Sequence, residues 1–214
     1  MVRSICFFVV IVLIVGSPMT LTSCARRVNE GREKHIEYTS DKELNRKVNE
    51  WTKEGWEIHG STRTLEGALR RHNERMEANP NLTERIGTAT NCKSAAVCRL
   101  TALNNASVDY SMSVANEVDG RFRQELSVDE SNEKEYNKLE ATFSGKLEGG
   151  IRSQLEESFA LIKTKNGKSE YMIFFLLDRN AAAKMQEKAF EQVMEEAGIQ
   201  PETRIKLREL MKAK

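Results

Sequence analysis

Cysteines are the residues of this 214-residue chain best suited to covalent chemistry, and Cys24 has the most informative context. It closes the stretch LTSC, which fits the bacterial lipobox: a Leu, two small residues and a Cys whose thiol becomes diacylated. Before it, Arg3 and an apolar run over residues 5–15 have the order of a secretory signal, and that run is too short to span a bilayer. We therefore predict that residues 1–23 are a lipoprotein signal peptide and that Cys24 carries the lipid. The alternatives are an uncleaved signal anchor and an ordinary cleaved signal.

Two further cysteines, Cys92 and Cys98, would face an oxidising periplasm, where disulfides form and persist. On one helix they would lie about 9 Å apart along the axis. That separation exceeds the roughly 7 Å between Cα atoms that a disulfide tolerates. A disulfide therefore requires Cys92 to lie off the helix, in the turn before it, and two unbonded thiols are the favoured alternative. The spacing is not that of a zinc site and no His is near, so we predict no metal and no cofactor.

The histidines His35, His59 and His72 belong to no recognisable catalytic motif. His72 falls on the apolar face of a predicted helix, which favours a packing role over catalysis. We therefore predict that the protein is not an enzyme.

Aromatic side chains are the remaining candidates for binding. Trp51, Trp56 and Tyr110 present rings that could stack on the sugars of the cell wall. For the two tryptophans, anchoring a helical hairpin is the favoured alternative.

Charge argues against a nucleic-acid partner. The chain has 33 Lys and Arg against 32 Asp and Glu, and Arg3 is the only charged residue before Cys24, so the mature chain is balanced. Nucleic-acid binders carry a basic excess or stripe, and none is seen here. With 39% hydrophobic and 30% charged residues, the composition is that of a folded globular domain.

The patterning divides the mature chain into four parts. We predict a polar tether, a helical hairpin, an α+β core and a C-terminal helix, at residues 24–40, 41–80, 81–198 and 199–214.

Within the core, a short strand at 85–91 precedes a long helix that begins near Ser94. A further helix is expected from a capping box at 127–130. Asn166-Gly167 between two β-rich runs predicts a hairpin. The strand at 169–178 is apolar on both faces, which indicates a central strand covered on both sides. The predicted fold is α+β: a small antiparallel sheet backed by long helices, with the helical hairpin or a second subunit covering its other face.

The order of these features resembles the LPP-twenty type of small bacterial lipoprotein. The resemblance rests on the lipobox, a strand followed by the Ala-rich segment SAAVCRLTALNNASVDYSMSVANEVDGR, and a hairpin followed by LDRNAAAKMQEKAFEQ. The segment EWTKEGWEIHGSTRTLEGALRRHNERM is similar to uncharacterised Bacteroidales-type relatives. The family has no established catalytic residues, and the resemblance implies a structural lipoprotein of the envelope.

We therefore expect a lipid-anchored, non-catalytic lipoprotein with a structural or assembly role. Its partners would be the membrane, through the lipid, and a second copy or another envelope protein. Ala25 and Arg26 follow Cys24 where an Asp would retain a lipoprotein at the inner membrane, so we expect the outer membrane, facing the periplasm. A ligand- or peptidoglycan-binding module is the alternative.

Overall fold

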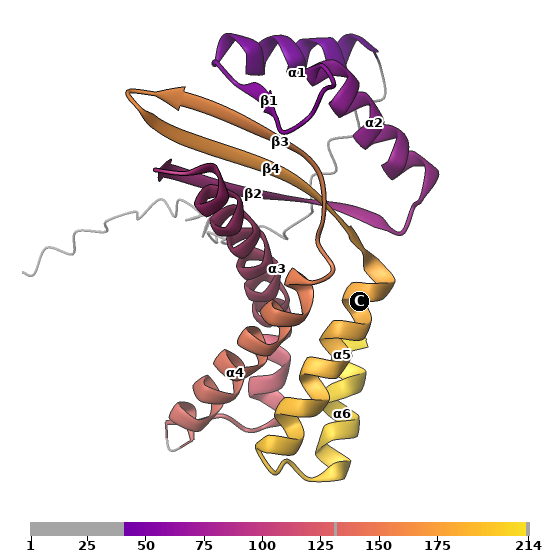
Figure 1. Ribbon diagram of the computed structural model, residues 1–214. Helices are drawn as coiled ribbons and strands as arrows, with labels where there is room; N and C mark the ends of the chain where they lie inside the picture. Colours follow the sequence, from indigo (N-terminus) through magenta and orange to yellow (C-terminus); the bar gives the residue numbers. More distant parts are fainter. Residues whose placement is uncertain (1–40, 131, 213–214) are drawn as a thin grey trace, which may run out of the picture. The chain divides into compact units, whose positions relative to one another are not determined.

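The computed structural model describes residues 41–130 and 132–212 (Figure 1). The predicted signal peptide, Cys24 and the tether lie outside the described residues. Within them the chain forms six helices and four strands. In order these are α1 (Asp41–Lys53), β1 (Glu57–His59), α2 (Leu65–Ala78), β2 (Leu82–Cys92), α3 (Ala95–Glu125), α4 (Glu133–Arg152), β3 (Glu156–Lys165), β4 (Lys168–Asp178), α5 (Arg179–Glu196) and α6 (Pro201–Lys212). The predicted α+β class is confirmed.

The four strands form one antiparallel sheet in the order β1-β3-β4-β2. Asn166 and Gly167 join β3 to β4 with φ angles of 54° and 72°, the left-handed conformation that a two-residue hairpin of this type requires. Strand β4 pairs on both sides, and its residues 173–177 are buried. The predicted hairpin and central strand are therefore confirmed.

Helices α1 and α2 cover one face of the sheet (Figure 1). The N-terminal hairpin, rather than a second subunit, thus supplies the second layer. Trp51 lies in its core, with its ring centroid 5.4 Å from that of Phe174 on β4. The buried cluster consists of Leu44, Trp51, Ala68, Leu69, Phe159, Leu161 and Phe174.

The sequence predicted that residues 41–80 form a helical hairpin, but this segment is not entirely helical. Between α1 and α2, β1 pairs with β3 at the sheet edge. Gly55 and Gly60 flank it with φ of +84° and +68°, which end α1 and then turn the chain toward α2. Three residues show too little alternation to predict a strand, so pairing with β3 decides its conformation.

The first half of α3 covers the opposite face of the sheet. Its contact with β2 is close, because a Cβ at Gly87 would lie 2.0 Å from the carbonyl oxygen of Ala102. Ala102 and Ala106 are fully buried there. Small side chains on both elements therefore let the helix backbone approach the strand.

The second half of α3 leaves the sheet and packs with α4, α5 and α6 in a separate helical layer. Phe122, Phe143, Leu147 and Phe190 are central to this cluster. One boundary differs from the prediction: Ser127 has φ of +49°, and α4 begins only after Asn132, so no capping box forms at 127–130. Strand β2 is also longer than predicted, because residues 82–84 pair with the end of β4.

Cys92 and Cys98 form a disulfide, with their Cα atoms 5.5 Å apart. Cys92 is the last residue of β2 and Ser94 caps α3, so Cys92 lies off the helix. This turn removes the separation that had favoured two unbonded thiols. The preference for two unbonded thiols was therefore wrong, and the disulfide with Cys92 off the helix is the geometry that forms.

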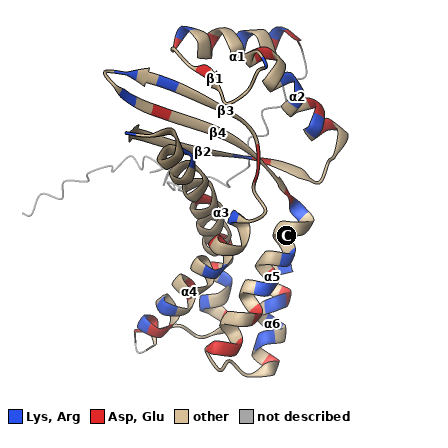
Figure 2. Ribbon diagram, in the orientation of Figure 1, with Lys and Arg blue, Asp and Glu red and all other residues tan. Residues whose placement is uncertain are grey.

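Figure 2 shows acidic and basic residues interspersed on the helices. Many form ion pairs one helical turn apart, such as Arg46 with Glu50 and Arg123 with Asp119. Within residues 41–130 and 132–212, no helix is long and apolar enough to cross a bilayer.

Candidate functional site

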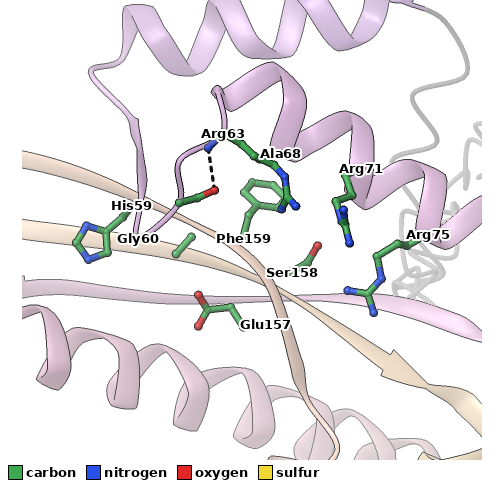
Figure 3. A pocket seen from close by; sticks show the side chains of 11 residues that line it. His59, Gly60, Arg63, Ala68, Arg71, Arg75, Glu157, Ser158 and Phe159 are labelled. Carbon is green, nitrogen blue, oxygen red and sulfur yellow. Dashed lines mark hydrogen bonds between the residues drawn. The ribbon is translucent and has the colours of Figure 1, made fainter.

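A cavity of about 170 Å³ lies between α2, strand β3 and the loop that joins β1 to α2 (Figure 3). Strand β1 pairs with β3 only along residues 160–162, so at residues 157–159 the edge of β3 opposite β4 has no strand beside it. The cavity occupies this place. Its lining is polar: His59, Gly60 and Ser61 from the loop side, Arg63, Arg71 and Arg75, and Glu157 and Ser158 from β3, with Ala68, Phe159 and Ala160.

A β-bulge brings Ser158 to the cavity. The pairing of β3 with β4 shifts register between Glu157 and Phe159. In a regular strand neighbouring side chains point to opposite faces, whereas a bulge re-aims a side chain. Here Ser158 and Phe159 both contact His72 of α2, and Glu157 contacts Arg99 of α3 on the other face.

His72 connects two strands through its two ring nitrogens. Nδ1 lies 2.9 Å from Ser158 Oγ, and Nε2 lies 2.7 Å from a carboxylate oxygen of Glu84 on β2. The ring is 2% exposed and meets Phe159 and Phe174 edge-on, with centroid distances of 5.5 and 6.0 Å. An ionised carboxylate only accepts hydrogen bonds, so Nε2 carries a hydrogen; in the neutral ring Nδ1 then accepts a hydrogen bond from the serine hydroxyl. We name Ser158, His72 and Glu84 the His72 chain.

Three arginines surround the cavity. Arg75 pairs with Glu156 at 2.8 Å. Arg63 and Arg71 form no ion pair with any residue in the described part of the chain. Figure 3 shows the Ser158 hydroxyl pointing from β3 toward α2, on the side where the Arg71 guanidinium lies.

Glu157 borders the cavity, but its charge is already neutralised. Both carboxylate oxygens accept hydrogen bonds from Arg99, at 2.5 and 2.6 Å. The bond to Glu157 raises the pKa of Arg99 above its ordinary value. The cavity therefore keeps net positive charge from Arg63 and Arg71.

The aromatic residues proposed for binding do not lie together. Trp51 is 5% exposed, so its ring faces are covered. Trp56 is half-buried, with the Lys163 ammonium 4.7 Å from its ring and its own Nε1 donating to Glu54. Tyr110 belongs to the helical layer on the other side of the sheet. Its hydroxyl bonds to Gln186 at 2.6 Å, and burial raises its pKa.

Sequence reasoning placed His72 on an apolar face but missed its polar partners. Ser158 is 86 residues away and Glu84 belongs to another strand, so no local motif connects them. His59, also without a motif, borders the cavity and lies 3.2 Å from the hydroxyl of Tyr171. Among the described residues, no group of three or more His, Cys, Asp or Glu is arranged to hold a metal ion.

Comparison with known proteins adds no further constraint: no family model, no curated protein and no solved structure matches the chain.

Proposed function

We propose that this chain is a lipid-anchored envelope protein, facing the periplasm, whose folded part is a non-catalytic ligand-binding module. The observation that carries the binding role is the polar cavity, where unpaired arginines and a hydrogen-bonded serine converge. Ligand sites are concave and hold a few convergent polar groups.

The lipid anchor rests on the LTSC sequence at Cys24. The Cys92–Cys98 disulfide supports the compartment, because disulfides persist in the periplasm and are rare in the cytosol. Outer-membrane residence rests on Ala25 and Arg26, as argued from the sequence.

A structural or assembly role is the second candidate, and one observation favours it. Helix α3 exposes Val97, Leu100 and Met112, with 57%, 58% and 53% of their surfaces accessible. Apolar side chains of this exposure are suited to contact a second copy or another envelope protein.

The anchor is tested by replacing Cys24 with Ala in cells fed a labelled fatty acid such as palmitate. We expect loss of the label and release of the protein from the membrane fraction, because the acylated thiol is gone. Cys6→Ala is the matched control and should change neither result. Membrane retention of Cys24→Ala, together with an unlabelled wild type, would refute the anchor.

The two roles are separated by native mass spectrometry of the full chain after gentle solubilisation. A binding module should release a bound small molecule from the wild type but not from Ser158→Trp, whose larger side chain fills the cavity. Val97→Ser with Leu100→Ser should keep that molecule. If the α3 variant instead loses a protein partner, and the wild type carries no small molecule, the assembly role is the correct one.

A further inference from the structure

We propose that the cavity binds a phosphate group, held by the guanidinium groups of Arg63 and Arg71 and by the hydroxyl of Ser158. This inference rests on the proposed binding role and names the chemistry of its ligand.

The charge is positive because the neighbouring carboxylates are already engaged. Glu156 pairs with Arg75, and Glu157 pairs with Arg99. On the adjacent sheet surface, Glu84 accepts from His72. No carboxylate among the cavity lining is therefore left to neutralise Arg63 and Arg71, and an incoming anion would supply that charge.

The polar groups that line the cavity come from three separate elements. Arg63 precedes α2, Arg71 lies two turns into it, and Ser158 is on β3, with the three arranged around one hollow in Figure 3. A carboxylate is planar and is satisfied by one guanidinium in a bidentate pair. A phosphate presents tetrahedral oxygens to several directions at once, so it fits donors that approach from different sides.

The His72 chain fixes the third polar group, the hydroxyl of Ser158. Nε2 donates its hydrogen to the Glu84 carboxylate, and this contact orients the ring so that Nδ1 faces Ser158. In the neutral ring Nδ1 carries no hydrogen, so it accepts the hydroxyl hydrogen of Ser158 and leaves a lone pair of the serine oxygen facing the cavity. Ser158 then accepts a hydrogen bond from a P–OH group of the ligand, in a rotamer that the buried ring holds in place.

The size of the cavity limits the ligand. A volume of about 170 Å³ is below the roughly 300 Å³ at which pockets for drug-sized ligands begin. A phosphate group fits, but a large organic part must extend outside. The phosphate can therefore belong to a free phosphate or monoester, or to a lipid headgroup.

The test uses the full-length chain in a non-ionic detergent and titration calorimetry at constant ionic strength. The probes are inorganic phosphate and dioctanoyl phosphatidic acid, with dioctanoyl phosphatidylcholine as the lipid control. We expect binding of at least one phosphate probe. Arg71→Ala should weaken it about tenfold or more, because a charge-assisted hydrogen bond is lost. Ser158→Ala should weaken it by a smaller factor.

Arg46→Ala is the matched control, since it removes the same charge from the exposed surface of α1 and should leave the affinity unchanged. Circular dichroism before and after urea confirms that each variant is folded. Binding of inorganic phosphate identifies a free-phosphate site, and binding of phosphatidic acid alone identifies a lipid headgroup site.

Two results overturn the inference: neither phosphate probe binds, or Arg46→Ala weakens binding as much as Arg71→Ala. If phosphate fails while native mass spectrometry still finds a small molecule that Ser158→Trp excludes, the binding role stands and only its chemistry is wrong. If no small molecule is found either, both the phosphate inference and the proposed binding role are refuted.

Discussion

The His72 chain makes a quantitative prediction for Glu84→Leu. The substitution removes the acceptor of a ring nitrogen in His72, whose side chain is only 2% exposed. A tautomer change does not help, because Ser158 satisfies only one of the two nitrogens. A buried polar group left without a partner costs about 1–3 kcal/mol, so we expect the free energy of unfolding to fall by about 2 kcal/mol.

Glu84→Leu should hardly change the free energy of unfolding once the imidazole ring of His72 has been removed. In a His72→Leu background, Glu84→Leu leaves no unpaired nitrogen and removes a carboxylate that is only 18% exposed. The double-mutant cycle should therefore give a coupling of about 2 kcal/mol. Urea unfolding followed by tryptophan fluorescence measures all four proteins, because the rings of buried Trp51 and of His72 both contact Phe174. An equal cost of Glu84→Leu in both backgrounds, or a single-mutant cost below about 0.5 kcal/mol, would refute the reasoning.

Two further predictions concern packing and pH. Gly87→Ala should cost about 3 kcal/mol or more, because its Cβ would overlap the Ala102 carbonyl, whereas Gly145→Ala, with open space around it in α4, should stabilise by about 0.5–1 kcal/mol; urea unfolding of both variants tests the pair, and equal effects would contradict it. Burial raises the pKa of Tyr110 and of Tyr136 above the ordinary value, so the unfolded chain loses these protons first and stability should fall as pH rises above about 10. Urea midpoints at about pH 8 and about pH 11 measure the fall, which Tyr136→Phe should reduce; a flat profile would show that these hydroxyls do not control alkaline stability.

Local signals in the sequence account for much of the fold. Asn166-Gly167 specifies the tight hairpin because both residues accept positive φ. The two-sided apolar strand has to lie between two layers, and the structure places α1 and α2 on one face and α3 on the other. These predictions succeed because they depend on a few adjacent residues and on the period of burial.

The parts that were missed depend on partners distant in the chain. Strand β1 is three residues long and is defined by its pairing with β3. Residues 82–84 at the start of β2 form no distinct strand pattern of their own, yet they pair with the end of β4. Ser127 has a residue spacing that fits a capping box, but its backbone adopts φ of +49°, which ends the preceding turn instead of starting a helix.

The candidate site was hidden for a related reason. Its central contact joins residues 86 positions apart, and it depends on a bulge that composition does not reveal. A regular β3 would turn either Ser158 or Phe159 away from α2. The only sequence signal was a histidine on an apolar face, and a buried imidazole has to find polar partners somewhere. That requirement was predictable, whereas the identity of Ser158 and Glu84 was not.

Stability and binding should be linked through the position of α2. Arg71 moves with this helix, and the polar contacts that hold it to the sheet are those of His72 with Ser158 and Glu84, and of Arg75 with Glu156. Glu84 does not line the cavity, yet Glu84→Leu loosens the helix that carries one wall of it. We therefore expect this variant to weaken phosphate binding about threefold to tenfold, measured by calorimetry at a temperature where the variant remains folded. Gly145→Ala, which changes stability in the distant helical layer, should leave the affinity unchanged. If Glu84→Leu lowers stability without lowering affinity, the apolar contacts of α2 alone fix the cavity, and the His72 chain serves packing only.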